Sequence, residues 1–243
     1  MSSLKTNFVQ SGIGKNILFL HGWGSDISDF LGSYNHFSKN YHVINLDLWG
    51  FGKSETPKEV WGCDDYIKHL YEFVKENHLK NLNLVGHSFG GKLAIKFCNL
   101  YPSLCKSLIL VDSSGVRKKL SFVKRLKIYR YKKLKELVLQ GKKDKMVLEK
   151  FGSSDYKNSN GIMKKIMTKV VNEDCENELK SIDIPTLLFW GKQDKDTPLY
   201  MAKKMHKQIK NSKLICLNGG HFSHIDNFLE FNKTAQNFWE GIW

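Results

Sequence analysis

The sequence contains no apolar run long enough to cross a bilayer, and its mean hydropathy is -0.39. Its first residues, MSSLKTNFVQSG, include one lysine and no apolar core, so they predict no signal peptide. The cysteines are odd in number, scattered and without a Cys-x-x-Cys pair: Cys63, Cys98, Cys105, Cys175 and Cys216. These absences argue against a disulfide framework and a zinc site, and they predict reduced thiols in a cytoplasmic protein.

Arginine is scarce, with only Arg117, Arg125 and Arg130, and 24 acidic residues face 38 basic ones. Of the resulting net charge of +14, residues 117–150 carry +11, because they hold 14 Lys/Arg and three acidic residues. A lysine-rich solvated face is the simplest interpretation. The second hypothesis is weak association of 117–150 with an anionic membrane surface or an acidic substrate. Lysine bias and the absence of a recognition motif predict no nucleic-acid partner.

Short apolar runs alternate with longer stretches of helical spacing. The expected strands are 16–22, 41–50, 81–86, 106–112, 185–191 and 213–218, with a weak one near 6–11. Helices are expected at 63–79, at 90–101, from Pro198, and near 226–240. Apolar strands alternating with helices predict an α/β fold with a mostly parallel, doubly wound sheet and helices on both faces.

The alternation stops between Ser114 and Ile184, where apolar residues recur at three- and four-residue steps and 151–161 is a polar loop. We therefore expect a helical cap, or lid, at 115–183, inserted into a core made of 1–114 and 184–243. Some apolar cap residues should roof a pocket and the others should seat the cap on the core. The candidates are Leu120, Phe122, Val123, Tyr129, Tyr131 and Met163.

A serine stands between two glycines at the point where the strand 81–86 turns into a helix, in Gly86-His87-Ser88-Phe89-Gly90. This spacing predicts a sharp strand-turn-helix with a strained serine backbone, in which side chains at Gly86 and Gly90 would collide with neighbouring backbone. The serine oxygen would then project at the sheet's C-terminal edge, beside the free N–H groups of a helix N-terminus.

A serine hydroxyl needs a base, and the base needs an orienting acid. Asp194 follows the strand 185–191, and His221 follows the strand 213–218. Both therefore fall at the C-terminal edge, where Ser88 emerges and where open α/β sheets bind ligands. The order Ser, Asp, His is the order that this architecture uses.

These motifs resemble those of α/β-hydrolase-fold serine hydrolases with a helical cap. The matching segments are HGWG (21–24), DLWGFGKSE (47–55), GHSFGG (86–91), WGKQD (190–194) and GGHFSHID (219–226). The resemblance implies Ser88 as nucleophile, His221 as general base and acid, and Asp194 as the orienting carboxylate. It also implies an oxyanion hole from the backbone N–H groups of Trp23 and Phe89, with neither a metal nor a cofactor.

Rivals remain for two of these roles. Asp112, which ends the strand before the cap, and Asp196 are alternatives for the acid, because some family members take their acid from that earlier strand. His224 is an alternative to His221, although His221 directly follows the double glycine.

Other polar residues in the motifs have structural interpretations. His21 is expected to anchor the oxyanion loop and His87 to fill the variable position before the nucleophile. Ser25 and Asp26 are expected to cap the following helix.

Serine at position 88 argues against dehalogenases and epoxide hydrolases of this fold, which carry aspartate there. Hydrolases of C–C bonds in this family share the triad, but their oxyanion loop usually continues as Gly-Pro-Gly, whereas this chain reads HGWGSD. A carboxylesterase of small or medium acyl esters fits best. C–C bond hydrolase, thioesterase and peptidase activities stay open, as does a ligand receptor that retains the triad with slow turnover.

Overall fold

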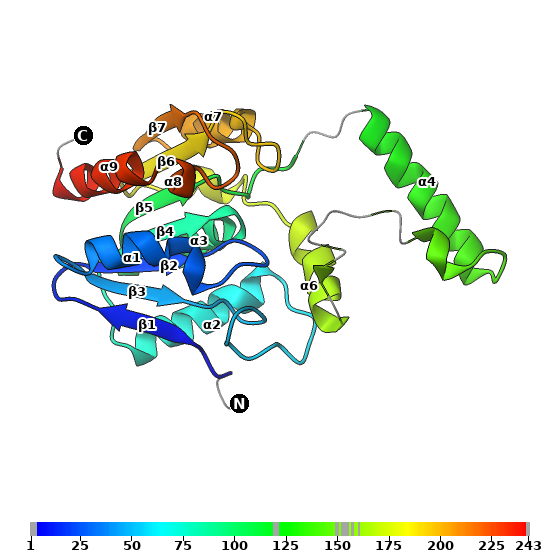
Figure 1. Ribbon diagram of the computed structural model, residues 1–243, viewed down its shortest axis with the longest axis horizontal. Helices are drawn as coiled ribbons and strands as arrows, with labels where there is room; N and C mark the ends of the chain where they lie inside the picture. The colour runs from blue at the N-terminus through cyan, green and yellow to red at the C-terminus, as the bar shows by residue number, and fades with distance from the viewer. Residues whose placement is uncertain are drawn as a thin grey trace.

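A seven-stranded sheet forms the centre of the computed structural model, which describes residues 4–118, 122–148, 151, 156, 158–159 and 161–241 (Figure 1). The strands are β1 (Phe8–Ser11), β2 (Asn16–Leu20), β3 (His42–Leu46), β4 (Leu82–His87), β5 (Cys105–Val111), β6 (Thr186–Gly191) and β7 (Ser212–Leu217). Their order is β1-β3-β2-β4-β5-β6-β7, and β1 is antiparallel to β3 while the other neighbours are parallel. The predicted mostly parallel sheet is confirmed, and the weak strand near 6–11 is β1.

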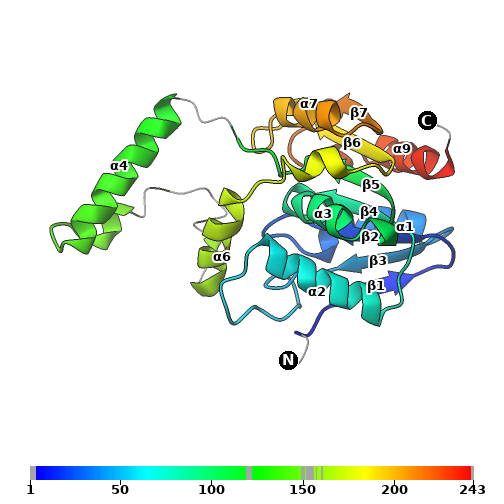
Figure 2. The same cartoon turned by 180° about the vertical axis from the view of Figure 1, so that it is seen from behind.

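Helices cover both faces of the sheet, as predicted (Figures 1 and 2). One face carries α1 (Leu31–Phe37) and α9 (Phe228–Glu240), and the other carries α2 (Cys63–Glu76), α3 (Ser88–Leu100) and α7 (Leu199–Gln208). The two cores follow from the alternation of side chains along each strand. In β2, Ile17 and Phe19 join the α1/α9 core, whereas Leu18 and Leu20 join the core under α2 and α3.

Strand β3 ends at Leu46, four residues before the predicted end at position 50. The cause is Asp47, whose carboxylate accepts the backbone N–H groups of Ile27 and Lys53, each at 2.8 Å. These bonds hold the chain in a loop, in which Gly50 adopts a left-handed φ of 89°. The loop carries residues 47–55 toward the sheet's C-terminal edge.

The insertion between β5 and β6 contains α4 (Phe122–Leu139), the 3-10 helix η3 (Lys145–Leu148) and α6 (Gly161–Asn172). Helix α6 packs on the core through Ile166 and Val170, which are buried. Helix α4 stands apart from the sheet and packs on η3 (Figures 1 and 2). The described part of the insertion therefore contains a helix that packs on the core, α6, and an arm that projects from the core, formed by α4 and η3.

The expectation that residues of α4 roof a pocket is wrong for Val123 and Tyr129, whose exposed fractions are 60% and 63%. Apolar and basic side chains alternate around this helix, so it has no continuous apolar face wide enough to pack on the core. Tyr131 is half-buried, and Met163 of α6 packs against the core. The remaining two candidates, Leu120 and the side chain of Phe122, lie outside the described residues.

All five cysteines are free thiols, and only Cys216 is partly exposed. Burial raises the pKa of Cys175 to about 12, so this thiol stays protonated at neutral pH and is a poor nucleophile. None of the described helices combines the length and apolarity needed to span a membrane.

Candidate active site

Ser88 lies in a sharp turn between β4 and α3 and has a left-handed φ of 48°. Both flanking glycines are sterically required. A Cβ at Gly86 would lie 2.6 Å from the Gly90 oxygen, and one at Gly90 would lie 2.1 Å from the Leu20 oxygen. The strained backbone expected at the serine is therefore present, and it holds the hydroxyl above the end of β4.

Three side chains from separate segments meet at this edge. His221 Nε2 lies 2.9 Å from Ser88 Oγ, and His221 Nδ1 lies 2.9 Å from Asp194 Oδ2. A carboxylate only accepts hydrogen bonds, so the Nδ1 proton faces Asp194 and the Nε2 lone pair is free to accept the Ser88 proton. The structure thus brings together the three residues predicted to form the triad.

The loop that follows β6 holds Asp194 in its ionised form. Asp194 Oδ1 accepts the backbone N–H groups of Asp196 at 2.7 Å and Thr197 at 2.9 Å, and the Thr197 hydroxyl lies 2.6 Å from Oδ2. Burial opposes the charge, but the hydrogen bonds from His221 and Thr197 outweigh it and lower the pKa of Asp194. Thr197 was missed in the sequence, where nothing distinguishes it from any other loop threonine.

The two alternative acids, Asp112 and Asp196, make different contacts from those of Asp194. Asp112 accepts the backbone N–H of Gly191 on one oxygen and that of Ser223 on the other, each at 2.8 Å. Burial raises the pKa of Asp112. Asp196 is exposed and contributes its backbone N–H to Asp194. The rival base His224 is buried, with Nε2 3.2 Å from Asp29 Oδ1.

The two predicted oxyanion donors lie beside the nucleophile. Phe89 is the second residue of α3, and the first four N–H groups of a helix have no acceptor within the helix. A Cβ at Gly22 would lie 3.3 Å from Ser88 Cβ, so the HGWG loop packs directly against the serine. The Trp23 ring contacts Phe89 at a centroid distance of 5.4 Å. The roles of the Trp23 and Phe89 N–H groups stay predictions.

A buried ion pair lies beneath the triad. His87 Nδ1 is 2.8 Å from Asp29 Oδ2, and His87 Nε2 is 2.7 Å from the backbone oxygen of His221. Both partners only accept hydrogen bonds, so both ring nitrogens carry protons and His87 is an imidazolium. Burial opposes that charge, but Asp29 raises the pKa of His87 overall.

The ion pair of His87 and Asp29 joins the loop of His221 to the HGWG loop, because Asp29 Oδ2 also accepts the backbone N–H of Gly22 at 3.2 Å. Burial works against the Asp29 charge, but His87 and His224 lower the pKa of Asp29 well below its usual range. The prediction that His87 is structural is correct but incomplete, because its partner Asp29 was missed. Asp26 lies three residues before Asp29 but has a different role. It caps the helix η1 (Ile27–Phe30), as expected.

His21 anchors the loop that carries the predicted oxyanion donor Trp23, as expected. Its Nδ1 lies 2.7 Å from the Gly22 oxygen, and its Nε2 accepts the Leu48 N–H at 2.9 Å. Burial lowers the pKa of His21, which agrees with a neutral ring that donates from one nitrogen and accepts at the other.

Replacing Asp29 with asparagine should lower the free energy of unfolding by about 3 kcal/mol, because it leaves the buried His87 without its counter-charge. The pKa of Asp29 is lowered from 3.8 and that of His87 is raised from 6.5, so the pair stabilises most between about pH 4 and 6.5. Its contribution is lost as pH falls below 3.8, and as pH rises above 6.5 through the raised pKa of His87. Urea unfolding of the wild type and Asp29→Asn near pH 6 and pH 9 measures the difference in their free energies of unfolding, which should be larger near pH 6.

Asp26→Asn is the matched control, because asparagine caps a helix as well as aspartate does and Asp26 is only partly buried. Equal stabilities of Asp29→Asn and the wild type near pH 6 would contradict the ion pair.

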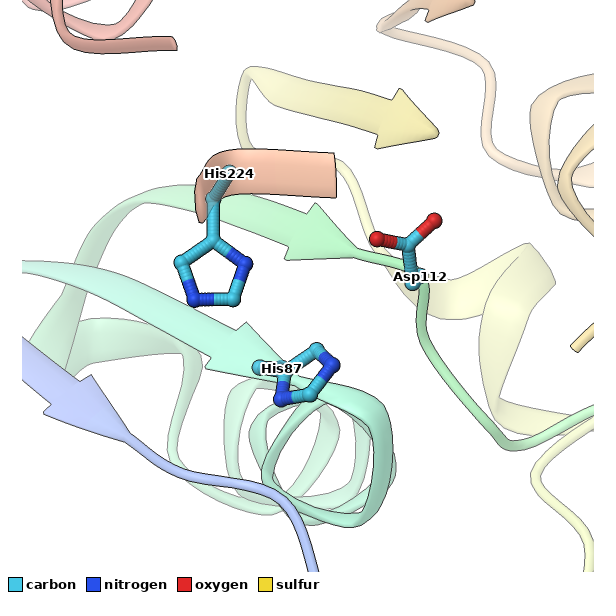
Figure 3. A group of neighbouring side chains, drawn as sticks. All are labelled: His87, Asp112 and His224. Carbon is cyan, nitrogen blue, oxygen red and sulfur yellow. The ribbon is translucent and has the colours of Figure 1, made fainter. Parts of the chain in front are cut away.

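His87, Asp112 and His224 gather at the ends of β4 and β5 and on the short helix α8 (Ser223–Asp226), close enough to be tested as a metal site (Figure 3). Both nitrogens of His87 donate hydrogen bonds, so neither has a lone pair to offer. Each Asp112 oxygen already accepts a backbone N–H. This cluster is therefore a hydrogen-bonded support of the site and does not fit a metal.

Comparisons with known proteins agree with this arrangement. Residues 15–135 match the family model described as alpha/beta hydrolase fold. The chain is 28% identical to "AB hydrolase superfamily protein YisY" of Bacillus subtilis, over 96% of this chain and 95% of that protein.

Two further relatives are named for an activity. The chain is 27% identical to "Lipase 1" of Psychrobacter immobilis, over 93% of this chain and 76% of that protein. It is 25% identical to "2-hydroxy-6-oxo-6-(2'-aminophenyl)hexa-2,4-dienoic acid hydrolase" of Metapseudomonas resinovorans, over 97% of this chain and 87% of that protein.

Proposed function

Because the chain belongs to the α/β-hydrolase-fold superfamily, we propose that it is a serine hydrolase that cleaves carboxylic esters with small to medium acyl chains. The observation that carries the proposal is the line of contacts from Ser88 through His221 to Asp194, with two distances of 2.9 Å. The reduced thiols fit a cytoplasmic location.

In the proposed mechanism, His221 Nε2 takes the proton of Ser88 Oγ as this oxygen attacks the acyl carbonyl. The imidazolium that forms is stabilised by ionised Asp194, and the backbone N–H groups of Trp23 and Phe89 bind the oxyanion. His221 then protonates the leaving alcohol. In the second half-reaction, His221 activates a water molecule that releases the acid and restores Ser88.

The magnitudes are sufficient for ester hydrolysis with water as the only co-reactant. General base catalysis contributes about 10²–10⁴-fold. Each oxyanion donor contributes about 10²–10³-fold in comparable enzymes. The Trp23 ring contacts the rings of Phe51 and Phe89, the residue after Ser88, and an apolar surface here would favour a hydrocarbon chain over a charged one.

An ester is favoured over a C–C bond by the oxyanion loop, which reads HGWGSD without the Gly-Pro-Gly of that group. The similarity to a lipase supports an ester, whereas the similarity to the hexadienoic acid hydrolase keeps C–C cleavage as the second candidate. Thioester and amide cleavage use the same triad and differ only in the leaving group.

A series of p-nitrophenyl esters from acetate to dodecanoate tests the proposal. We expect multiple turnovers with the highest kcat/KM for short or medium chains. A thioester and an anilide of the preferred acyl group, and a hydroxy-oxo-hexadienoate, should react more slowly. Faster cleavage of the hexadienoate would establish the C–C alternative. A single turnover with every ester would indicate a receptor that retains the triad.

A further inference from the structure

The arm formed by α4 and η3, residues 122–148, is the most basic part of the described chain. It contains ten Lys/Arg and two acidic residues, which gives a net charge of +8. Helix α4 packs on η3 and stands away from the sheet, as both views show (Figures 1 and 2). The basic residues of α4 whose side chains are described are all exposed: Arg125, Lys127, Arg130, Lys132, Lys133 and Lys135.

The same arm exposes large apolar side chains. Six of the fifteen exposed large hydrophobic residues among the described part of the chain lie on it: Val123, Leu126, Ile128, Tyr129, Leu139 and Met146. Leu139 is the last residue of α4 and Met146 lies in η3, and their exposed fractions are 77% and 68%. The exposed Lys142 and Lys143 lie in the segment between them. Clustered exposed apolar residues mark interaction sites more often than scattered ones do.

Positive charge continues to the base of the arm. A pocket of about 350 Å³ lies there, lined by Val116, Arg117, Lys118, Arg125, Glu176, Tyr200 and Lys204. Glu176 pairs with Lys204, and Arg117 pairs with Asp174 at 3.1 Å. Four basic side chains against the one acidic residue of the lining favour an anionic group at this position.

We propose that the arm docks on an anionic phospholipid bilayer. Lysines near such a surface are attracted by the negative potential of the headgroups, and apolar side chains between them insert at the boundary with the acyl chains. Nucleic acid would use the charge but would leave the aliphatic side chains exposed, and phosphate recognition on nucleic acid favours the arginine fork over lysine. The combination of lysine and aliphatic residues therefore fits a lipid surface better.

Docking of the arm would place the active site of the proposed ester hydrolase close to the membrane surface. The arm belongs to the same insertion as α6, and Trp23 Nε1 donates to Ser159 just before α6 at 3.3 Å. A membrane-bound arm would hold the site near the bilayer, into which esters with medium acyl chains partition. The docking itself does not depend on whether Ser88 is a nucleophile.

Vesicle flotation tests the proposal with the full chain. At low salt, we expect binding to phosphatidylcholine vesicles that contain about 30% phosphatidylglycerol, and little binding to pure phosphatidylcholine. Binding should fall steeply at about 0.5 M NaCl, because salt screens exposed charges. Absence of binding to the anionic vesicles at low salt would overturn the proposal.

Two variants with the same net charge separate the arm from the overall charge. The arm variant replaces Lys127, Arg130, Lys132 and Lys133 with glutamine, and its partition coefficient should fall at least about tenfold. The control variant replaces the exposed core lysines 75, 80, 207 and 210 with glutamine and should change binding by less than about twofold. Equal losses in both variants would assign the binding to net charge and contradict the arm.

A third variant tests the apolar contribution, with serine in place of Leu126, Ile128 and Tyr129. It should lose vesicle binding while keeping circular dichroism and turnover of a water-soluble ester. Unchanged vesicle binding, together with tight salt-dependent binding of a single-stranded RNA oligonucleotide, would replace the lipid surface with nucleic acid.

Discussion

Ser88→Ala is expected to reduce kcat/KM for the preferred p-nitrophenyl ester by at least about 10⁴-fold. The substitution removes the one oxygen that lies 2.9 Å from His221 Nε2. Alanine keeps the Cβ, so the backbone strain at φ 48° is the same in both proteins. Urea unfolding and circular dichroism should therefore match the wild type while turnover is lost.

Ser103→Ala is the matched control, because Ser103 is exposed and lies in the 3-10 helix that precedes β5. Its kcat/KM should stay within about twofold of the wild type, as surface substitutions away from a site have small effects. Wild-type turnover by purified Ser88→Ala would remove Ser88 from the mechanism.

Asp194→Asn should lower kcat by about 10⁴-fold. The carboxylate accepts the Nδ1 proton of His221 at 2.9 Å, which leaves Nε2 free to act as a base. An asparagine amide would donate to Nδ1, and the ring would then carry its proton on Nε2, facing Ser88. The pKa of Asp194 lies below its usual value, so the wild-type site keeps the productive tautomer at neutral pH. Steady-state kinetics on the preferred ester measure the loss.

The neighbouring carboxylate supplies the control. Asp196 is exposed, and it touches Asp194 through its backbone N–H, which Asp196→Asn retains. This variant should keep kcat within about threefold of the wild type. A larger loss in Asp196→Asn than in Asp194→Asn would exchange the roles of the two carboxylates.

The positions of the three residues of the candidate triad were predictable because local sequence patterns determine them. Each of Ser88, Asp194 and His221 follows an apolar strand, and parallel strands bring their C-terminal ends to one edge. The glycines around Ser88 indicate a tight turn, because a Cβ at Gly86 or Gly90 would collide with backbone atoms.

The support beneath the triad was not predictable in the same way. Asp29 and His87 are 58 residues apart, and the His221 oxygen that His87 holds is a further 134 residues along the chain. The sequence does not indicate which backbone oxygen will accept a hydrogen bond from a distant side chain. The three- and four-residue apolar spacing predicted a helix in the segment of α4, but it did not predict that this helix projects from the core. The same spacing describes a packed helix, and only the exposed fractions of the side chains separate the two cases.

The central claim is that Ser88 is the nucleophile activated by His221. The most direct measurement is peptide mass spectrometry of the wild-type protein after reaction with a fluorophosphonate. The account predicts one phosphonylated residue, Ser88, and a strongly reduced labelling rate in His221→Ala. Modification of another residue, or equally fast labelling without His221, would contradict it.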